Sequence, residues 1–204
     1  MDKMITSLNS RRLLLALVGL VVGFASAANA VTFNDGGTHI IDATNSYPLD
    51  PVIVEDSATG QPTTLIINTG GDIGSISGDG LTANGSSVVT MNGGVVSGTV
   101  YAYSESELTI TGVSSSLDGD IHLSGSASLS FSDATLKGPC GTCSIYDAHR
   151  IVGEENSTIL ILSGNNLRVY VPPQSNALVD IRGGNFWRFG EGAMIDVQNG
   201  RLAL

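Results

Sequence analysis

The sequence predicts an all-β chain that folds as a β-solenoid with about 20 residues per coil. A phrase repeated three times between Ser86 and Gly138 is the first sign, since each copy holds an alternating strand, a second short apolar step and a glycine. The apolar pairs of these strands recur at intervals of 19 and 21 residues. Within each copy the apolar residues alternate with a period of two, and helical spacing is absent.

Two apolar residues of each strand are expected to face inward. In chain order these pairs are Leu65/Ile67, Val89/Met91, Leu108/Ile110, Leu129/Phe131, Ile159/Ile161, Val179/Ile181 and Ile195/Val197. One coil cannot bury its pair alone, whereas stacked coils form continuous aliphatic ladders and pair their backbones. We expect seven to eight coils, the last one shortened to an interval of 16 residues.

Residues 1–30 are predicted to be a signal peptide. The segment carries three basic residues, Lys3, Arg11 and Arg12. An apolar run of twelve residues over 13–24 follows, and then a small-x-small cleavage site at Ala28 and Ala30. Twelve residues are too few to span a bilayer as a helix. We therefore expect export, by the general secretory route rather than the twin-arginine route, and a mature chain that starts at Val31 without a transmembrane segment.

The stretch 31–62 is predicted to be an irregular N-terminal cap. Strand Val31–Phe33, turn Asn34–Gly37 and strand Thr38–Asp42 are expected to form a hairpin, because Asp-Gly suits a type I′ turn. Prolines break regular structure in the residues that follow. A cap here would shield the apolar layers of the first coil.

The period is interrupted at 138–153, which we interpret as a loop inserted into a β-helix of residues 63–204. Cys140 and Cys143 lie in this loop as a CxxC pair. In an exported chain we expect a structural disulfide between them. A redox motif would need a βαβ context. A zinc site would need two further ligands, of which His149 could supply one.

Charge is distributed unevenly along the chain. Lys and Arg total 9 against 19 Asp and Glu. Between Val31 and Leu136 there is no Lys or Arg, but there are twelve carboxylates. This pattern indicates a solubilising acidic surface or, alternatively, a cation-binding face. Sequence-independent binding of nucleic acid is excluded as a partner class, because it needs basic charge.

Four carboxylates make the candidate metal site. Asp118 and Asp120 lie at a coil corner, and Glu105 and Glu107 precede them in the repeat. Stacked carboxylates can bind Ca²⁺, which takes six to eight oxygen ligands. The alternative is a solvated acidic edge, and no other cofactor is expected.

Near the C-terminal end, Phe186, Trp187 and Arg188 form an aromatic group that includes the single tryptophan. One interpretation is that these rings cover the last aliphatic layer. The other is a platform that stacks on a sugar ring, with Arg188 as its polar partner.

The stretch Met91–Tyr103 resembles repeats of exported bacterial proteins with right-handed, single-stranded parallel β-helices. These include PEP-CTERM-type exported proteins and, more loosely, autotransporter passenger domains. The resemblance extends over about Thr63–Leu204 and implies that fold. One departure is that the sequence as read to Leu204 shows no Val-Pro-Glu-Pro sorting signal, apolar anchor or basic tail, which leaves open a soluble relative or an incomplete chain.

Two functions stay open at this point. The first is an exported, non-enzymatic structural, surface or adhesion protein. The alternative is a β-helix that binds or degrades polysaccharide of the cell surface or matrix. Pectin-lyase-like enzymes join acidic clusters to Arg or Lys, and the acidic coils here carry neither. Hydrolysis by paired aspartates remains as an enzymatic alternative.

Overall fold

The computed structural model describes most of the chain after the predicted signal peptide. The described residues are 29–137, 149–165, 167–185, 188–189, 192–193, 195–197 and 201–203. Within them, no helix is long and apolar enough to cross a membrane. The apolar run predicted to belong to a signal peptide lies outside the described residues.

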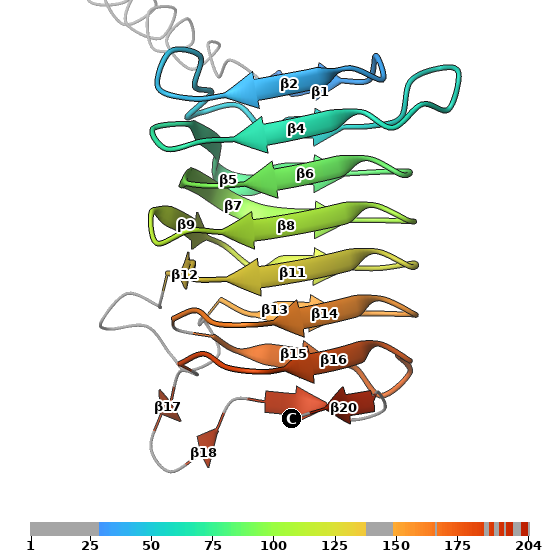
Figure 1. The fold of residues 1–204 in the computed structure, drawn as a ribbon, viewed down its shortest axis with the longest axis vertical. Helices are drawn as coiled ribbons and strands as arrows, with labels where there is room; N and C mark the ends of the chain where they lie inside the picture. Colours follow the sequence, from blue (N-terminus) through green and yellow to red (C-terminus); the bar gives the residue numbers. More distant parts are fainter. Residues whose placement is uncertain are drawn as a thin grey trace, which may run out of the picture.

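Two parallel sheets make up the solenoid (Figure 1). The eight-stranded sheet contains β2 (Thr38–Ile41), β4 (Thr64–Ile67), β6 (Val88–Met91), β8 (Glu107–Thr111), β11 (Ser128–Ser132), β14 (Thr158–Ile161), β16 (Leu178–Ile181) and β20 (Arg201–Ala203). The ten-stranded sheet contains β1 (Val31–Phe33), β3 (Val52–Val54), β5 (Asp72–Ala83), β7 (Gly94–Ala102), β10 (Ile121–Leu123), β13 (Ile151–Gly153), β15 (Val169–Val171) and β19 (Ile195–Val197). In the same sheet, β9 (Ser115–Asp118) pairs with the first half of β7, and β12 (Thr135–Leu136) pairs with β9. An antiparallel pair, β17 (Arg188–Phe189) and β18 (Gly192–Ala193), lies apart from both.

The chain winds as the sequence predicts. In Figure 1 the strands of the eight-stranded sheet run to the left in front, the opposite sheet runs to the right behind them, and successive coils descend. This sense of rotation is right-handed. Because the coils are stacked, each strand pairs in parallel with the equivalent strand of the next coil. This pairing provides hydrogen-bond partners for the backbone N–H and C=O groups.

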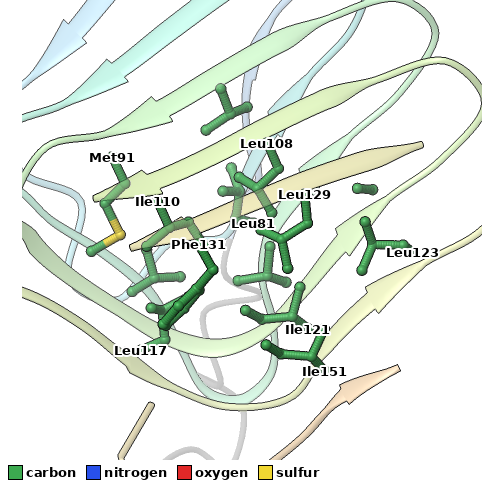
Figure 2. Close-up of a cluster of buried hydrophobic side chains, with 14 of the residues drawn as sticks. Leu81, Met91, Leu108, Ile110, Leu117, Ile121, Leu123, Leu129, Phe131 and Ile151 are labelled. Atoms are coloured by element: carbon green, nitrogen blue, oxygen red, sulfur yellow. The ribbon is translucent and has the colours of Figure 1, made fainter. Parts of the chain in front are cut away.

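The predicted inward pairs form the core. From Leu65 to Val179 the first members of six pairs are in register, rung on rung, through β4, β6, β8, β11, β14 and β16. Their second members run parallel to them and include Ile110 and Phe131, both almost fully buried. Figure 2 shows these side chains meeting Leu117, from β9, inside the coil. The period-two pattern and its register are confirmed.

The predicted last pair belongs to the other sheet, so this part of the register was wrong. Ile195 pairs with Val169 and Val197 pairs with Val171, in β19 and β15. The residue that follows Val179 in the eight-stranded sheet is Leu202 of β20. Alternating strands of the two sheets look alike in sequence, and a shortened interval gave no sign that the chain had moved to the opposite face.

The predicted N-terminal hairpin was also wrong. Strand β1 pairs with β3 and strand β2 pairs with β4, all in parallel. Residues 34–37 are therefore a corner within the first coil, where Gly36 adopts a φ of 75°. The two strands lie on two faces of one coil and cannot pair with each other.

The coil between Leu65 and Val89 is longer than its neighbours, as the spacing predicted. The extra residues lie within β5, whose register with β7 shifts between Gly74 and Asp79 and again between Asp79 and Leu81. An irregularity of this kind takes up added length while the inward pairs on the opposite sheet stay in step.

A row of small polar side chains lines the inside of the corner before the eight-stranded sheet. Ser87, Ser106 and Ser157 are fully buried, and within the described residues their Oγ atoms have no hydrogen-bond partner. The register places Ala127 and Ala177 at the same position of neighbouring coils. A buried hydroxyl without a partner costs free energy, so alanine is the better fit to this position.

Candidate functional site

Two carboxylates flank one corner of the solenoid. Asp118 ends β9, Asp120 precedes β10, and Gly119 forms the corner between them. A Cβ at Gly119 would collide with the carbonyl oxygen of Gly98 in the preceding coil, so this turn has room only for glycine. The tight corner fixes both aspartates on the outside of the coil, where the Asp120 side chain is 23% exposed.

The cations that meet these carboxylates come from the following coil. Lys137 Nζ donates to Asp118 Oδ2 at 3.4 Å. His149 Nε2 lies 3.2 Å from Asp118 Oδ1, and its Nδ1 lies 3.7 Å from Asp120 Oδ1. The backbone nitrogen and Nε of Arg150 donate to the two oxygens of Asp120 at 3.0 and 3.1 Å. The acidic coils contain no Lys or Arg of their own, but the stacking of coils brings Lys137 and Arg150 of the next coil into contact with these carboxylates.

These contacts shift two pKa values in opposite directions. Burial alone would raise the pKa of Asp120, but hydrogen bonds from His122, His149 and Arg150 outweigh it and hold this pKa well below its ordinary value of 3.8. The hydrogen bond to Asp120 raises the pKa of His149, and burial only partly opposes this. Asp120 is therefore ionised, and its hydrogen bond favours the protonated form of His149.

The register arranges three charged residues as a ladder, which we call the arginine ladder: Asp120, Arg150 and Arg168. Ile121, Ile151 and Val169 pair in succession, so the residue before each occupies one position of three consecutive coils. Arg150 lies between the carboxylate and the second arginine. Burial and the positive charge of Arg150 lower the pKa of Arg168, although Asp120 partly offsets them.

An aromatic row runs beside this ladder on the outward face of the ten-stranded sheet; we define it as Tyr101, Tyr103, His122 and Tyr170. The register aligns Tyr101, His122, Val152 and Tyr170. The Tyr101 and His122 ring centroids are 5.4 Å apart, and the Tyr101 and Tyr103 rings are 5.6 Å apart and inclined by only 8°.

The row and the ladder are in direct contact. The Arg150 guanidinium carbon lies 5.7 Å from the centre of the Tyr170 ring, a cation–π geometry. Val152 points outward yet is only 3% exposed, so its neighbours on this face cover it. The two groups therefore form one continuous surface of rings and charges.

The four carboxylates of the predicted calcium site are not assembled as one group. Glu105 lies in the turn before β8 and Glu107 is the first residue of that strand, whereas Asp118 and Asp120 flank the corner between β9 and β10. Across the described residues, no group of three or more His, Cys, Asp and Glu side chains is arranged to hold a metal ion. Asp118 and Asp120 are instead engaged by cations.

Other predicted site residues fall beyond what the structure describes. Cys140 and Cys143 lie in the undescribed stretch 138–148, so the disulfide stays a prediction. Phe186 and Trp187 are also outside the described residues. For Arg188 the backbone is described, and it pairs with Ala193 in the small antiparallel sheet.

Sequence reasoning missed Lys137, Arg150, Arg168 and Tyr170. A usable signal was present, because a charged residue directly precedes an aliphatic strand at Asp120-Ile121, Arg150-Ile151 and Arg168-Val169. The prediction of an inserted loop over residues 138–153 hid it, because the end of that stretch, Ile151–Gly153, is strand β13 of the ten-stranded sheet.

A shallow groove of about 330 Å³ lies at a different corner of the coil. Its lining is mostly polar or glycine and comprises Val113, Asp133, Ser163, Gly164, Asn165, Gly184 and Asn185. Two pairs of its side chains bond to each other: Ser163 Oγ donates to Asp133 at 2.7 Å and Asn185 Nδ2 donates to Asn165 at 3.0 Å. These bonds use part of the hydrogen-bonding capacity of the groove, and none of its described lining residues is aromatic.

Comparison with protein-family models, with curated proteins and with solved structures found no match for this chain.

Proposed function

We propose that this chain is an exported, non-enzymatic β-solenoid of the surface or adhesion type that holds polysaccharide on its aromatic row. One observation carries the proposal: the parallel register places Tyr101, His122 and Tyr170 in a single outward line. Rings held by a rigid sheet present flat apolar faces at little entropic cost, and neighbouring polar groups can bond to sugar hydroxyls. A linear polymer matches a linear row.

Export is supported by the N-terminal sequence. A basic start, an apolar run over 13–24 and Ala28-Asn29-Ala30 have the order of a secretory signal. Mass spectrometry of the native protein tests this part. An N-terminus at Val31, in the medium or on the cell surface, is the expected result, and an intact N-terminus on a protein retained in the cytoplasm would contradict export.

Binding is tested with a panel of immobilised polysaccharides. We expect the Tyr101→Ala/Tyr170→Ala double variant to bind the retained polymer roughly tenfold more weakly or worse, because two stacking rings are lost. Ile40→Ala is the control, since Ile40 is 48% exposed on the opposite sheet. Equal binding by the double variant and the wild type, with both folded by circular dichroism, would refute the aromatic row as the binding surface.

Polysaccharide hydrolysis is the second candidate, because Asp118 and Asp120 lie beside the row and paired carboxylates cleave glycosides. A general acid needs a raised pKa, whereas the cations around Asp120 lower its pKa and hold its oxygens in place. We therefore favour binding over hydrolysis. Release of reducing ends from the bound polymer, abolished by Asp118→Asn, would reverse this preference.

A further inference from the structure

Positive charge is concentrated beside the aromatic row. The chain has a formal net charge of −10, and residues 31–136 contain no Lys or Arg. The structure describes four Lys and Arg side chains. Arg150 and Arg168 belong to the arginine ladder, and Lys137 contacts Asp118 beside it. The fourth, Arg182, is paired with Asp180 on the eight-stranded sheet. In a strongly acidic protein, this grouping is a local reversal of charge.

Among the described side chains, cations gather around two carboxylates. Lys137 and His149 contact Asp118, Arg150 contacts Asp120, and Arg168 occupies the next position of the arginine ladder. Arg150 and Arg168 lie in adjacent coils, and neighbouring parallel strands are about 4.8 Å apart. After burial, the positive charge of Arg150 is the next cause of the lowered pKa of Arg168, and a bound anion would offset this repulsion.

Donor groups of the cluster are accessible. Among the described residues, the Arg150 side chain donates through Nε to Asp120, and its guanidinium still carries two further nitrogens. Its side chain is 39% exposed, and that of Lys137 is 44% exposed. A guanidinium fork suits the planar, bidentate geometry of a carboxylate, and it also binds sulfate-type oxyanions.

The two ends of the aromatic row differ in the charge of the groups beside them. At its Tyr103 end, the negative charge of Asp79, from the preceding coil, contributes to the raised pKa of the tyrosine, after burial and Tyr101. At its other end, Tyr170 lies under Arg150. Anionic groups of a ligand on the row would be repelled from the first end and attracted to the second.

We propose that the ligand of the aromatic row is an anionic polysaccharide and that Arg150, Arg168 and Lys137 bind its negative groups near Tyr170. This inference rests on the proposed binding function and adds the ligand class to it. Two polymer chemistries share the required anion, uronate carboxylates and sulfate esters, and the planar fork of arginine binds both.

Matched polymers test the ligand class by isothermal titration calorimetry. Polygalacturonate is compared with its carboxyl-reduced form, and dextran sulfate is compared with dextran. We expect at least one charged polymer to bind roughly tenfold or more tightly than its neutral partner, with affinity falling as salt rises. The first pair reports on carboxylates and the second pair on sulfates.

Matched variants test the site. Arg168→Gln and Lys137→Gln should each weaken binding of the preferred polymer about tenfold. Arg182→Gln removes the same charge from the opposite sheet, where the side chain is 64% exposed, and should leave binding unchanged. Circular dichroism confirms that each variant is folded.

The outcomes separate the two proposals. Equal affinity for charged and neutral partners, still weakened by the tyrosine double variant, would overturn the anionic ligand and leave the binding function intact. Equal losses in Arg168→Gln and Arg182→Gln would show that overall charge, not this cluster, governs binding, and would also overturn the inference. If neither pair of polymers binds, the anionic ligand is overturned, and the binding function is decided by the panel of immobilised polysaccharides.

Discussion

Replacing Ile110 by aspartate should disrupt the middle of the solenoid. Ile110 is 1% exposed and pairs in register with Met91 of the preceding coil and Phe131 of the following coil. Losing its buried apolar area costs about 1.5–3 kcal/mol. Placing a carboxylate among aliphatic side chains costs several kcal/mol more. Together these approach the whole stability of a typical domain, roughly 5–15 kcal/mol. The milder Ile110→Ala should cost about 2–5 kcal/mol.

The assay is thermal unfolding followed by circular dichroism, with Thr109 as the matched site. Thr109 is the adjacent residue of β8, and its side chain faces outward. Ile110→Ala should lower the melting temperature by about 4–20 °C, and Ile110→Asp should lower it further or prevent folding. Thr109→Asp should remain close to wild type. A melt of Ile110→Asp that matched wild type, or a greater loss in Thr109→Asp, would refute the register.

Three further predictions concern the corners and the charged site. The pKa of Asp120 is lowered by folding, so its contribution to the free energy of unfolding is present above the ordinary pKa of 3.8 and is lost as the pH falls below that value. The pKa of His149 is raised by folding, so its contribution is complete below the ordinary pKa of 6.5 and is lost as the pH rises through the pKa of the folded state. Melting temperature should therefore be highest between about pH 4 and 6.5, and His149→Gln should flatten the alkaline decline; an unchanged decline would remove His149 as its cause. Ser106→Ala should raise stability by roughly 1 kcal/mol in urea titrations, because it removes a buried hydroxyl that lacks a partner, and a loss of stability would reveal a partner. Gly119→Ala should lower stability by at least about 2 kcal/mol, because its Cβ would collide with Gly98, and a wild-type melt would contradict this tight corner.

The inward pairs could be predicted from sequence because burial imposes a strict period of two. Leu108 and Ile110 cannot both face inward unless Thr109 faces out, and the recurrence of this pattern fixes which residues stack. The pattern does not say which sheet a strand joins. Ile195 and Val197 alternate as Val179 and Ile181 do, yet they extend the opposite sheet.

The charged site could not be predicted because its members are distant in sequence. Asp120 and Arg150 are 30 residues apart, and Arg150 belongs to the stretch 138–153 that interrupts the repeat. The absence of Lys and Arg between Val31 and Leu136 indicates an acidic surface, but in a solenoid the neighbours of one coil are the residues of the next coil. Only the register of β10 with β13 brings the two charges together.

Hydroxyl-radical footprinting of the protein, with and without the polysaccharide that it retains, tests the central claim most directly, because it locates the ligand. If the aromatic row is the binding surface, oxidation of Tyr101, Tyr103 and Tyr170 should fall on binding, and Val113, which is 89% exposed beside the groove at the other corner, should react as before. Protection of Val113 with unchanged tyrosines would place the ligand in that groove and contradict the account.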